Sequence, residues 1–109
     1  MIRHVVMWRL HEHADGADKT VNARRVRDAL EQMRGKVEGL MRLEVGINEL
    51  AGPQAYDLIL DCDLRDWSAL EYYREHPLHL AVIDLLNKVR SDRVVIDWEV
   101  CSETSETRH

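Results

Sequence analysis

The apolar residues of this chain repeat with two different periods, and the order of these periods constrains its fold more than any other feature. Four segments alternate with the two-residue period of strands, and they cover residues 2–10, 40–47, 55–63 and 93–101. Two segments show the three- to five-residue spacing of amphipathic helices, and they cover 18–34 and 66–90. This is the order of the ferredoxin-like β-α-β-β-α-β plan. We therefore expect an α+β fold with both helices on one face of a four-stranded antiparallel sheet.

The second helical segment contains a break. Asp66 is of a type preferred at helix N-caps, so a short helix is expected to begin there and to run through Glu75. Proline kinks a helix from an interior position but suits its first turn. We therefore place the break at His76-Pro77 and expect a further helix from this point to about Arg90.

The balance of charge argues against nucleic acid as a partner. The 109 residues include 15 Lys and Arg and 20 Asp and Glu, so the formal net charge is −5, with the two signs interspersed. Phosphate binding requires a clustered basic surface. The densest basic stretch, Arg24, Arg25 and Arg27, is closely followed by Asp28 and Glu31, and a solvated helix face explains it.

No feature of the sequence directs the chain to a membrane or out of the cell. No apolar run approaches the ~20 residues that span a bilayer, and Met1 to His4 do not begin a signal peptide. We expect a cytoplasmic domain of residues 1–101, in which Cys62 and Cys101 are reduced thiols rather than a redox pair. Residues 102–109 are polar and aperiodic, and we expect a disordered tail there.

In the ferredoxin-like plan the first and third strands are central, and the helices leave one face of the sheet open. We expect this face to carry Val5, Met7, Ile59 and Val95 at its centre, with Asp57 also pointing outward. Charged residues are expected at its edges: Arg42, Glu44, Arg93, Asp97 and Glu99. An apolar centre inside a charged rim is typical of self-association, so we expect a homodimer. The alternative is a monomer whose open face is solvated.

Five short segments stand in a characteristic order along the chain. They are Ile2–Val6, Gly39–Gly46, Tyr56–Leu60, Tyr73–His79 with its His-Pro-Leu-His box, and Asp92–Trp98. Together they extend over residues 2–100, and in this order they resemble the stress-responsive A/B-barrel domain (Dabb) family of the dimeric α+β barrel group. The resemblance implies a ferredoxin-like subunit and a barrel formed by two such subunits.

One well-understood relative in this group, a plant polyketide cyclase that makes olivetolic acid, closes a linear tetraketide by aldol condensation without a cofactor. The resemblance implies a ligand cavity between the helices and the sheet of each subunit. It implies that His79 is a general base, that Tyr73 supports it and that His4 belongs to the same site. We expect Val6, Trp8, Leu30, Leu58 and His76 to bind the substrate in this cavity. Leu30 stands near the position at which that cyclase has a cavity tyrosine, so the resemblance does not imply the same substrate.

The residues themselves are suited to proton transfer. His79 lies two residues after Pro77, in the first turn of a helix, where the helix dipole disfavours imidazolium and keeps the ring neutral near pH 7. A neutral imidazole beside the Tyr73 hydroxyl can enolise a carbon next to a carbonyl. The alternative is structural: His76 caps a helix, His79 bonds a backbone carbonyl, and His4 is a satisfied core histidine.

The sequence predicts neither a metal site nor a nucleotide site. His76 and His79 stand three apart, and His11 and His13 flank Glu12, but neither pair has the close carboxylate or cysteine set of a zinc site. No glycine-rich phosphate loop or nucleophile elbow is present. Two functions remain open: a cofactor-free cyclase or isomerase for a small oxygenated metabolite, or a non-catalytic binding or stress-protective dimer. An open cavity around His79 favours the first, and a closed, dry core favours the second.

Overall fold

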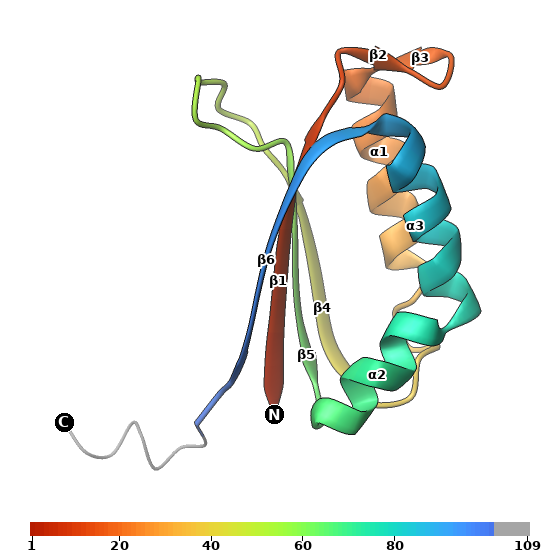
Figure 1. Ribbon diagram of the computed structural model, residues 1–109, viewed down its shortest axis with the longest axis vertical. Coiled ribbons are helices and arrows are strands. Elements are labelled where there is room, and N and C mark those ends of the chain that lie inside the picture. The colour runs from red at the N-terminus through yellow and green to blue at the C-terminus, as the bar shows by residue number, and fades with distance from the viewer. Residues whose placement is uncertain (102–109) are drawn as a thin grey trace, which may run out of the picture.

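The computed structural model describes residues 1–101 and consists of a four-stranded sheet with three helices on one of its faces (Figure 1). The strands of the sheet are β1 (Ile2–Leu10), β4 (Leu40–Ile47), β5 (Leu58–Leu64) and β6 (Arg90–Glu99). They are antiparallel in the order β4-β5-β1-β6, so β1 and β5 are central, which confirms the predicted fold. The expected disordered tail, residues 102–109, lies outside the described residues.

The helices are α1 (Lys19–Glu31), α2 (Trp67–Glu75) and α3 (Pro77–Val89), and a small hairpin of β2 (His13–Ala14) and β3 (Ala17–Asp18) precedes the first of them. The sequence predicts a plain loop at the position of this hairpin. Helices α1 and α3 lie side by side over the sheet, and α2 lies at one end (Figure 1). Within residues 1–101, no helix is long and apolar enough to cross a membrane.

Helix α1 begins where the sequence predicts and ends earlier. The Asp18 carboxylate accepts a hydrogen bond of 2.9 Å from the Val21 amide, as an N-cap does. The helix ends at Glu31, and a run of turns follows it. Met33 lies in these turns and is fully buried, so the apolar spacing continues past the end of the helix.

The break between α2 and α3 lies at His76-Pro77, as the sequence predicts. The Asp66 carboxylate caps α2 by accepting from the Ala69 amide at 2.8 Å. His76 then takes an extended conformation, and its Nδ1 accepts from the Leu78 amide at 3.1 Å, which caps α3. Pro77 occupies the first turn of α3, where its missing N–H leaves no hydrogen bond unmade. The break turns the chain so that α2 and α3 cover different parts of the sheet (Figure 1).

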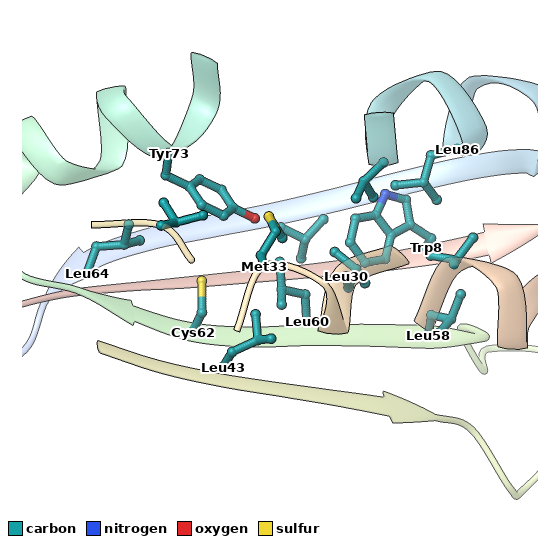
Figure 2. Close-up of a cluster of buried hydrophobic side chains, with 14 of the residues drawn as sticks. Trp8, Leu30, Met33, Leu43, Leu58, Leu60, Cys62, Leu64, Tyr73 and Leu86 are labelled. Atoms are coloured by element: carbon teal, nitrogen blue, oxygen red, sulfur yellow. The ribbon is translucent and has the colours of Figure 1, made fainter. Parts of the chain in front are cut away.

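The core lies between the sheet and the helices. The buried residues from the sheet are Ile2, Val6, Trp8, Leu10, Leu43, Leu58, Leu60, Cys62 and Leu64, and the helices add Val26, Leu30, Tyr73, Val82, Leu86 and Val89. Figure 2 shows how side chains from the two layers meet. Cys62 belongs to this core, and its burial raises the pKa of the thiol to about 12, so it is an unreactive packing residue.

Strand β6 turns the opposite face to the one that its sequence suggests. Val95 pairs with Val6 and therefore faces the helices, so its predicted place on the open face with Val5, Met7 and Ile59 is wrong. The same register moves Arg93 and Asp97 from the open face to the helix side. In an antiparallel pair, residues directly opposite share a face. The more apolar side of β6, with Val94 and Ile96, therefore lies beside Met7 and Val5 on the open face.

Two further details of the sheet differ from the expectation. Strand β5 begins only at Leu58, and the Asp57 carboxylate, expected to point outward, accepts a hydrogen bond from the Leu10 amide at 2.7 Å and pairs with Lys19 of α1. In β4 the register shifts between Leu40 and Arg42, which leaves Met41 as the extra residue of a β-bulge, 62% exposed. The two-residue alternation is lost at this bulge.

The helix-free side of the sheet, the open face, carries both apolar and charged side chains. Its apolar residues are Val5, Met7, Ile59, Val94, Ile96 and Trp98. An ion-pair cluster lies beside them, in which Asp63 accepts from Nε of Arg3 and from Nε of Arg42, each at 2.8 Å. These guanidinium groups hold the pKa of Asp63 down at about 2. The open face thus combines an exposed apolar centre with an internally neutralised charged patch.

Candidate active site

Two adjoining cavities lie between the sheet and the helices, at the predicted site residues. The first has a volume of about 230 Å³, and its polar lining residues are His4, Tyr73, His79, Asn87, Arg90 and Arg93. The second has a volume of about 320 Å³ and adds Arg74, Val95 and Asp97 to a shared wall of His4, Tyr73, His79, Ile83 and Arg93. The three residues predicted to carry chemistry therefore line one common space.

His79 is held in one tautomer by its surroundings. Its Nδ1 lies 3.0 Å from the Arg74 carbonyl oxygen, which can only accept, so Nδ1 carries the hydrogen. In the neutral ring Nε2 then holds the lone pair and can accept a proton. Burial lowers the pKa of His79 below its ordinary value of 6.5, and the position in the first turn of α3 acts in the same direction. His79 is therefore neutral at pH 7.

Tyr73 brings an unsatisfied hydroxyl into the space between the helices and the sheet. The residue is 1% exposed, and its hydroxyl oxygen has no hydrogen-bond partner within residues 1–101. Figure 2 shows this hydroxyl reaching from α2 into the interior. The ring centre lies 4.4 Å from that of His79 and 5.7 Å from that of His4. Burial raises the pKa of Tyr73, so the group remains a protonated donor.

His4 is paired with a carboxylate that lies on the neighbouring strand. His4 and Asp97 stand directly opposite each other in β1 and β6, and His4 Nδ1 donates to Asp97 Oδ1 at 2.5 Å. Burial lowers the pKa of His4, and the hydrogen bond to Asp97 opposes this effect. The ring is thus oriented by Asp97 with Nε2 left as the remaining polar atom. A carboxylate behind an imidazole is a common way to fix its tautomer.

The other predicted site residues divide into two groups. Val6, Trp8 and Leu30 lie in the wall of the first cavity, and their role in binding stays a prediction. Leu58 packs in the core and His76 caps α3, and neither lines either cavity.

The cavities also contain polar residues that the sequence reading missed. They are Asp97, Arg93, Arg90 and Asn87. Only the register of β6 against β1 shows that Arg93 and Asp97 face the cavity, because Arg93 lies opposite Trp8 and Asp97 lies opposite His4. Asn87 is an exposed polar residue one α3 turn beyond Ile83, and its sequence context does not indicate a place beside the cavity.

Nothing in this part of the chain assembles the donors of a metal centre. Among the described residues, no group of three or more His, Cys, Asp and Glu side chains could hold one ion. The donors nearest the cavity, His4 and His79, each use Nδ1 in a hydrogen bond within the protein. The ionisable groups that line the cavities are imidazole, phenol and guanidinium groups and the carboxylate of Asp97.

Comparison with known proteins gives the family and the fold. An uncharacterised protein of Streptomyces coelicolor is 31% identical over 99 residues, which cover 91% of this chain and 99% of that protein. A dimeric ferredoxin-like protein of unknown function from Thermobifida fusca matches with a TM-score of 0.78 and 22% identity, over 91% of this chain and 90% of that one. A hydroxynitrile lyase from Passiflora edulis matches with a TM-score of 0.73 and 11% identity, over 93% and 94%. The family model described as the stress responsive A/B barrel domain matches residues 2–100, and the chain belongs to this family.

Proposed function

We propose that the cavity catalyses proton transfer at a carbon next to a carbonyl in a small oxygenated metabolite, without a cofactor. The observation that carries the proposal is the buried Tyr73 hydroxyl, which has no partner within residues 1–101 and whose ring packs against His79. An unsatisfied buried hydroxyl costs stability. Such a cost is explained if the missing partner is an oxygen of the substrate.

The proposed step uses His79 as the base and Tyr73 as the donor. Nε2 of His79 takes the proton from the α-carbon, the C–H electrons form a carbon–carbon double bond, and the carbonyl π electrons move to oxygen. The Tyr73 hydroxyl donates a hydrogen bond to the resulting enolate oxygen. In an isomerisation the imidazolium returns its proton to a carbon of the enolate, whose oxygen electrons re-form a carbonyl. In a cyclisation the enolate carbon bonds to a second carbonyl carbon of the same molecule, the π electrons of that carbonyl move to its oxygen, and this alkoxide takes the proton from the imidazolium. All atoms come from the substrate and these two side chains.

His4 has a separate role in this proposal. Because its Nδ1–H is used by Asp97, the neutral ring can only accept at Nε2, and it is suited to bind a substrate hydroxyl. Trp8 and Leu30 supply apolar walls that exclude water from the reacting atoms. The Passiflora edulis protein, which shares this fold, is named a hydroxynitrile lyase.

We further propose that the protein is a homodimer formed through its open face. The support is the exposed apolar set defined above, of which Ile96 is 60% exposed, and the description of the Thermobifida fusca structure as dimeric. An apolar patch of this kind is rare on a monomer. The second subunit would cover the face opposite to the cavity and leave the cavity with its own subunit.

A non-catalytic binding dimer is the second candidate. Two observations favour it, because His76 caps α3 and His79 bonds the Arg74 carbonyl, as a structural role for each would require. The same hydrogen bond also fixes the tautomer that a base needs, so it does not separate the two functions. The Tyr73 hydroxyl favours catalysis, since a purely structural tyrosine would be paired or replaced by phenylalanine at no cost.

The experiment is an exchange assay that does not require the natural substrate. α-Proton exchange of small ketones in D2O, among them acetophenone and 3-benzoylpropionate, is followed by NMR with wild-type protein, His79→Gln and His11→Gln. His11 is an exposed histidine outside both cavities and serves as the matched control. Wild type and His11→Gln should accelerate exchange, and His79→Gln should lose about 10²–10⁴-fold. Ketones that bind without any acceleration would favour the binding dimer.

A further inference from the structure

The charged side chains around the two cavities are mostly positive, although the net charge of the whole chain is negative. Their walls contain three arginines, Arg74, Arg90 and Arg93, and one carboxylate, Asp97. The whole chain carries a net charge of −5. A site that is locally cationic on an acidic protein is suited to draw in an anion.

Two of these arginines have unused donors. Arg74 pairs with Glu71 at 3.4 Å, and Asp97 is used by His4. The Arg93 backbone amide donates to the Asp92 carboxylate, but within residues 1–101 no ion pair or hydrogen bond involves the guanidinium group of Arg90 or of Arg93. A guanidinium group offers five N–H donors in a planar fork that matches a carboxylate. The donors at the cavity are therefore available to a ligand.

Arg93 is the one of these three arginines that lines both cavities. It pairs with Trp8 in the register of β1 and β6, which turns it toward the helices, and it lines both cavities together with His4, Tyr73 and His79. Burial is the main cause that lowers the pKa of His4 and of His79, and the charge of Arg93 lowers both further. Arg93 and the proposed catalytic groups thus line the same space.

We infer that Arg93 binds a carboxylate of the substrate, with Arg90 as a second cation at the same end of the first cavity. The inference rests on the proposed function and names its substrate class: a small carboxylic acid that also carries a carbonyl and an apolar body. The apolar body contacts Trp8 and Leu30, and the carbonyl lies at the Tyr73 hydroxyl. The volume of about 230 Å³ limits the substrate to a small molecule.

The role of the ligand's charge is tested with two unreactive molecules of the same shape. 3-Phenylpropionate and 3-phenylpropanamide differ only in that the first has a carboxylate where the second has a neutral amide. Binding of each is measured by calorimetry and by the NMR signal of the Trp8 indole N–H, since Trp67 and Trp98 lie outside both cavities and serve as internal controls. The variants are Arg93→Gln, Arg93→Lys and, as a charge-matched control, Arg24→Gln on the exposed side of α1.

Wild type and Arg24→Gln should bind the carboxylate about tenfold or more tightly than the amide, with a shift of the Trp8 signal alone. Arg93→Gln should remove this preference, and Arg93→Lys should keep part of it, because lysine retains the charge without the fork. Equal binding of the two molecules by wild type, or no binding of the carboxylate at millimolar concentration, contradicts the inference.

This result is independent of the exchange assay. If the protein exchanges α-protons of neutral ketones but shows no preference for the carboxylate, the proposed function is supported and the proposed substrate class is wrong. If the protein prefers the carboxylate but exchanges no ketone, the anion site is supported and the proposed proton transfer is wrong.

Discussion

His4 and Asp97 occupy directly opposite positions of β1 and β6, and the His4 Nδ1 atom lies 2.5 Å from Asp97 Oδ1. This pair joins a central strand to an edge strand on the cavity side of the sheet. It therefore places a carboxylate behind one of the two imidazoles that line the proposed site.

Asp97→Asn tests the electrostatic part of this relationship. Burial lowers the pKa of His4, the carboxylate opposes this, and its removal should lower the pKa of His4 further. Because the pKa of His4 is lower in the folded protein than in the unfolded chain, the folded protein binds this proton more weakly. The free energy of unfolding therefore falls as the pH drops below 6.5. Between about pH 7.5 and 5.5, Asp97→Asn should lose roughly 1 kcal/mol more free energy of unfolding than wild type. Urea denaturation at the two pH values measures this, and an equal loss in both proteins would show that the pair has no electrostatic effect.

Tyr73→Phe separates a functional tyrosine from a structural one. The substitution removes a buried hydroxyl without a partner within residues 1–101, so the melting temperature should rise, by roughly 4–8 °C for each 1 kcal/mol gained. The rate of ketone exchange should fall, because the enolate oxygen loses its donor. Tyr72→Phe, at an exposed neighbouring tyrosine, is the matched control and should change neither quantity. A Tyr73→Phe protein that is less stable would mean that the hydroxyl has a partner in the folded protein.

Gly39→Ala tests how α2, and with it Tyr73, is positioned. Gly39 has φ of +87°, and a Cβ there would lie 2.6 Å from the Ala69 Cβ, one helical turn before Tyr73. Backbone strain and overpacking together should cost about 2–4 kcal/mol of unfolding free energy. Gly35 has a similar φ of +73° but open space around it, so Gly35→Ala should cost only about 1 kcal/mol. Equal losses in the two variants would show that the contact with Ala69 does not hold α2 in place.

The sequence predicts the local elements well because their signals are local. The N-cap at Asp66 and the helix break at Pro77 each depend on residues within one turn. The order of the elements then leads to the topology of the sheet. Residues His4, Tyr73 and His79 could be named from the resemblance to the family, and the structure brings them to one cavity.

What the sequence cannot predict depends on contacts between distant segments. Val95 and Asp97 are assigned to the wrong face because the apolar side of β6 is not the core side, and only the register with Val6 and His4 reveals this. Met41 leaves the alternation at a bulge that depends on its pairing with β5. The missing partner of the Tyr73 hydroxyl is a property of the packed interior, for which no residue pattern is a signal.

The proposed dimer is tested by charges placed at the centre of the open face. Val5 and Ile96 lie directly opposite each other on this face, and Val5→Glu with Ile96→Glu would bury two carboxylates in the interface. The double variant should sediment as a monomer in analytical ultracentrifugation, while wild type sediments as a dimer. Val21→Glu with Leu80→Glu introduces the same charge at exposed helix positions and should leave the dimer intact. A double variant at Val5 and Ile96 that remains dimeric at micromolar concentration would place the interface elsewhere.

The most direct test of the account is the pH dependence of ketone α-proton exchange. The account requires the neutral form of His79 as the base, and burial keeps the pKa of this residue below 6.5. The catalysed rate should therefore rise with pH through one ionisation below 6.5 and reach a plateau near pH 7, and His79→Gln should show no such step. A catalysed rate that falls with increasing pH, or the same step in His79→Gln, would contradict the assignment of His79 as the base.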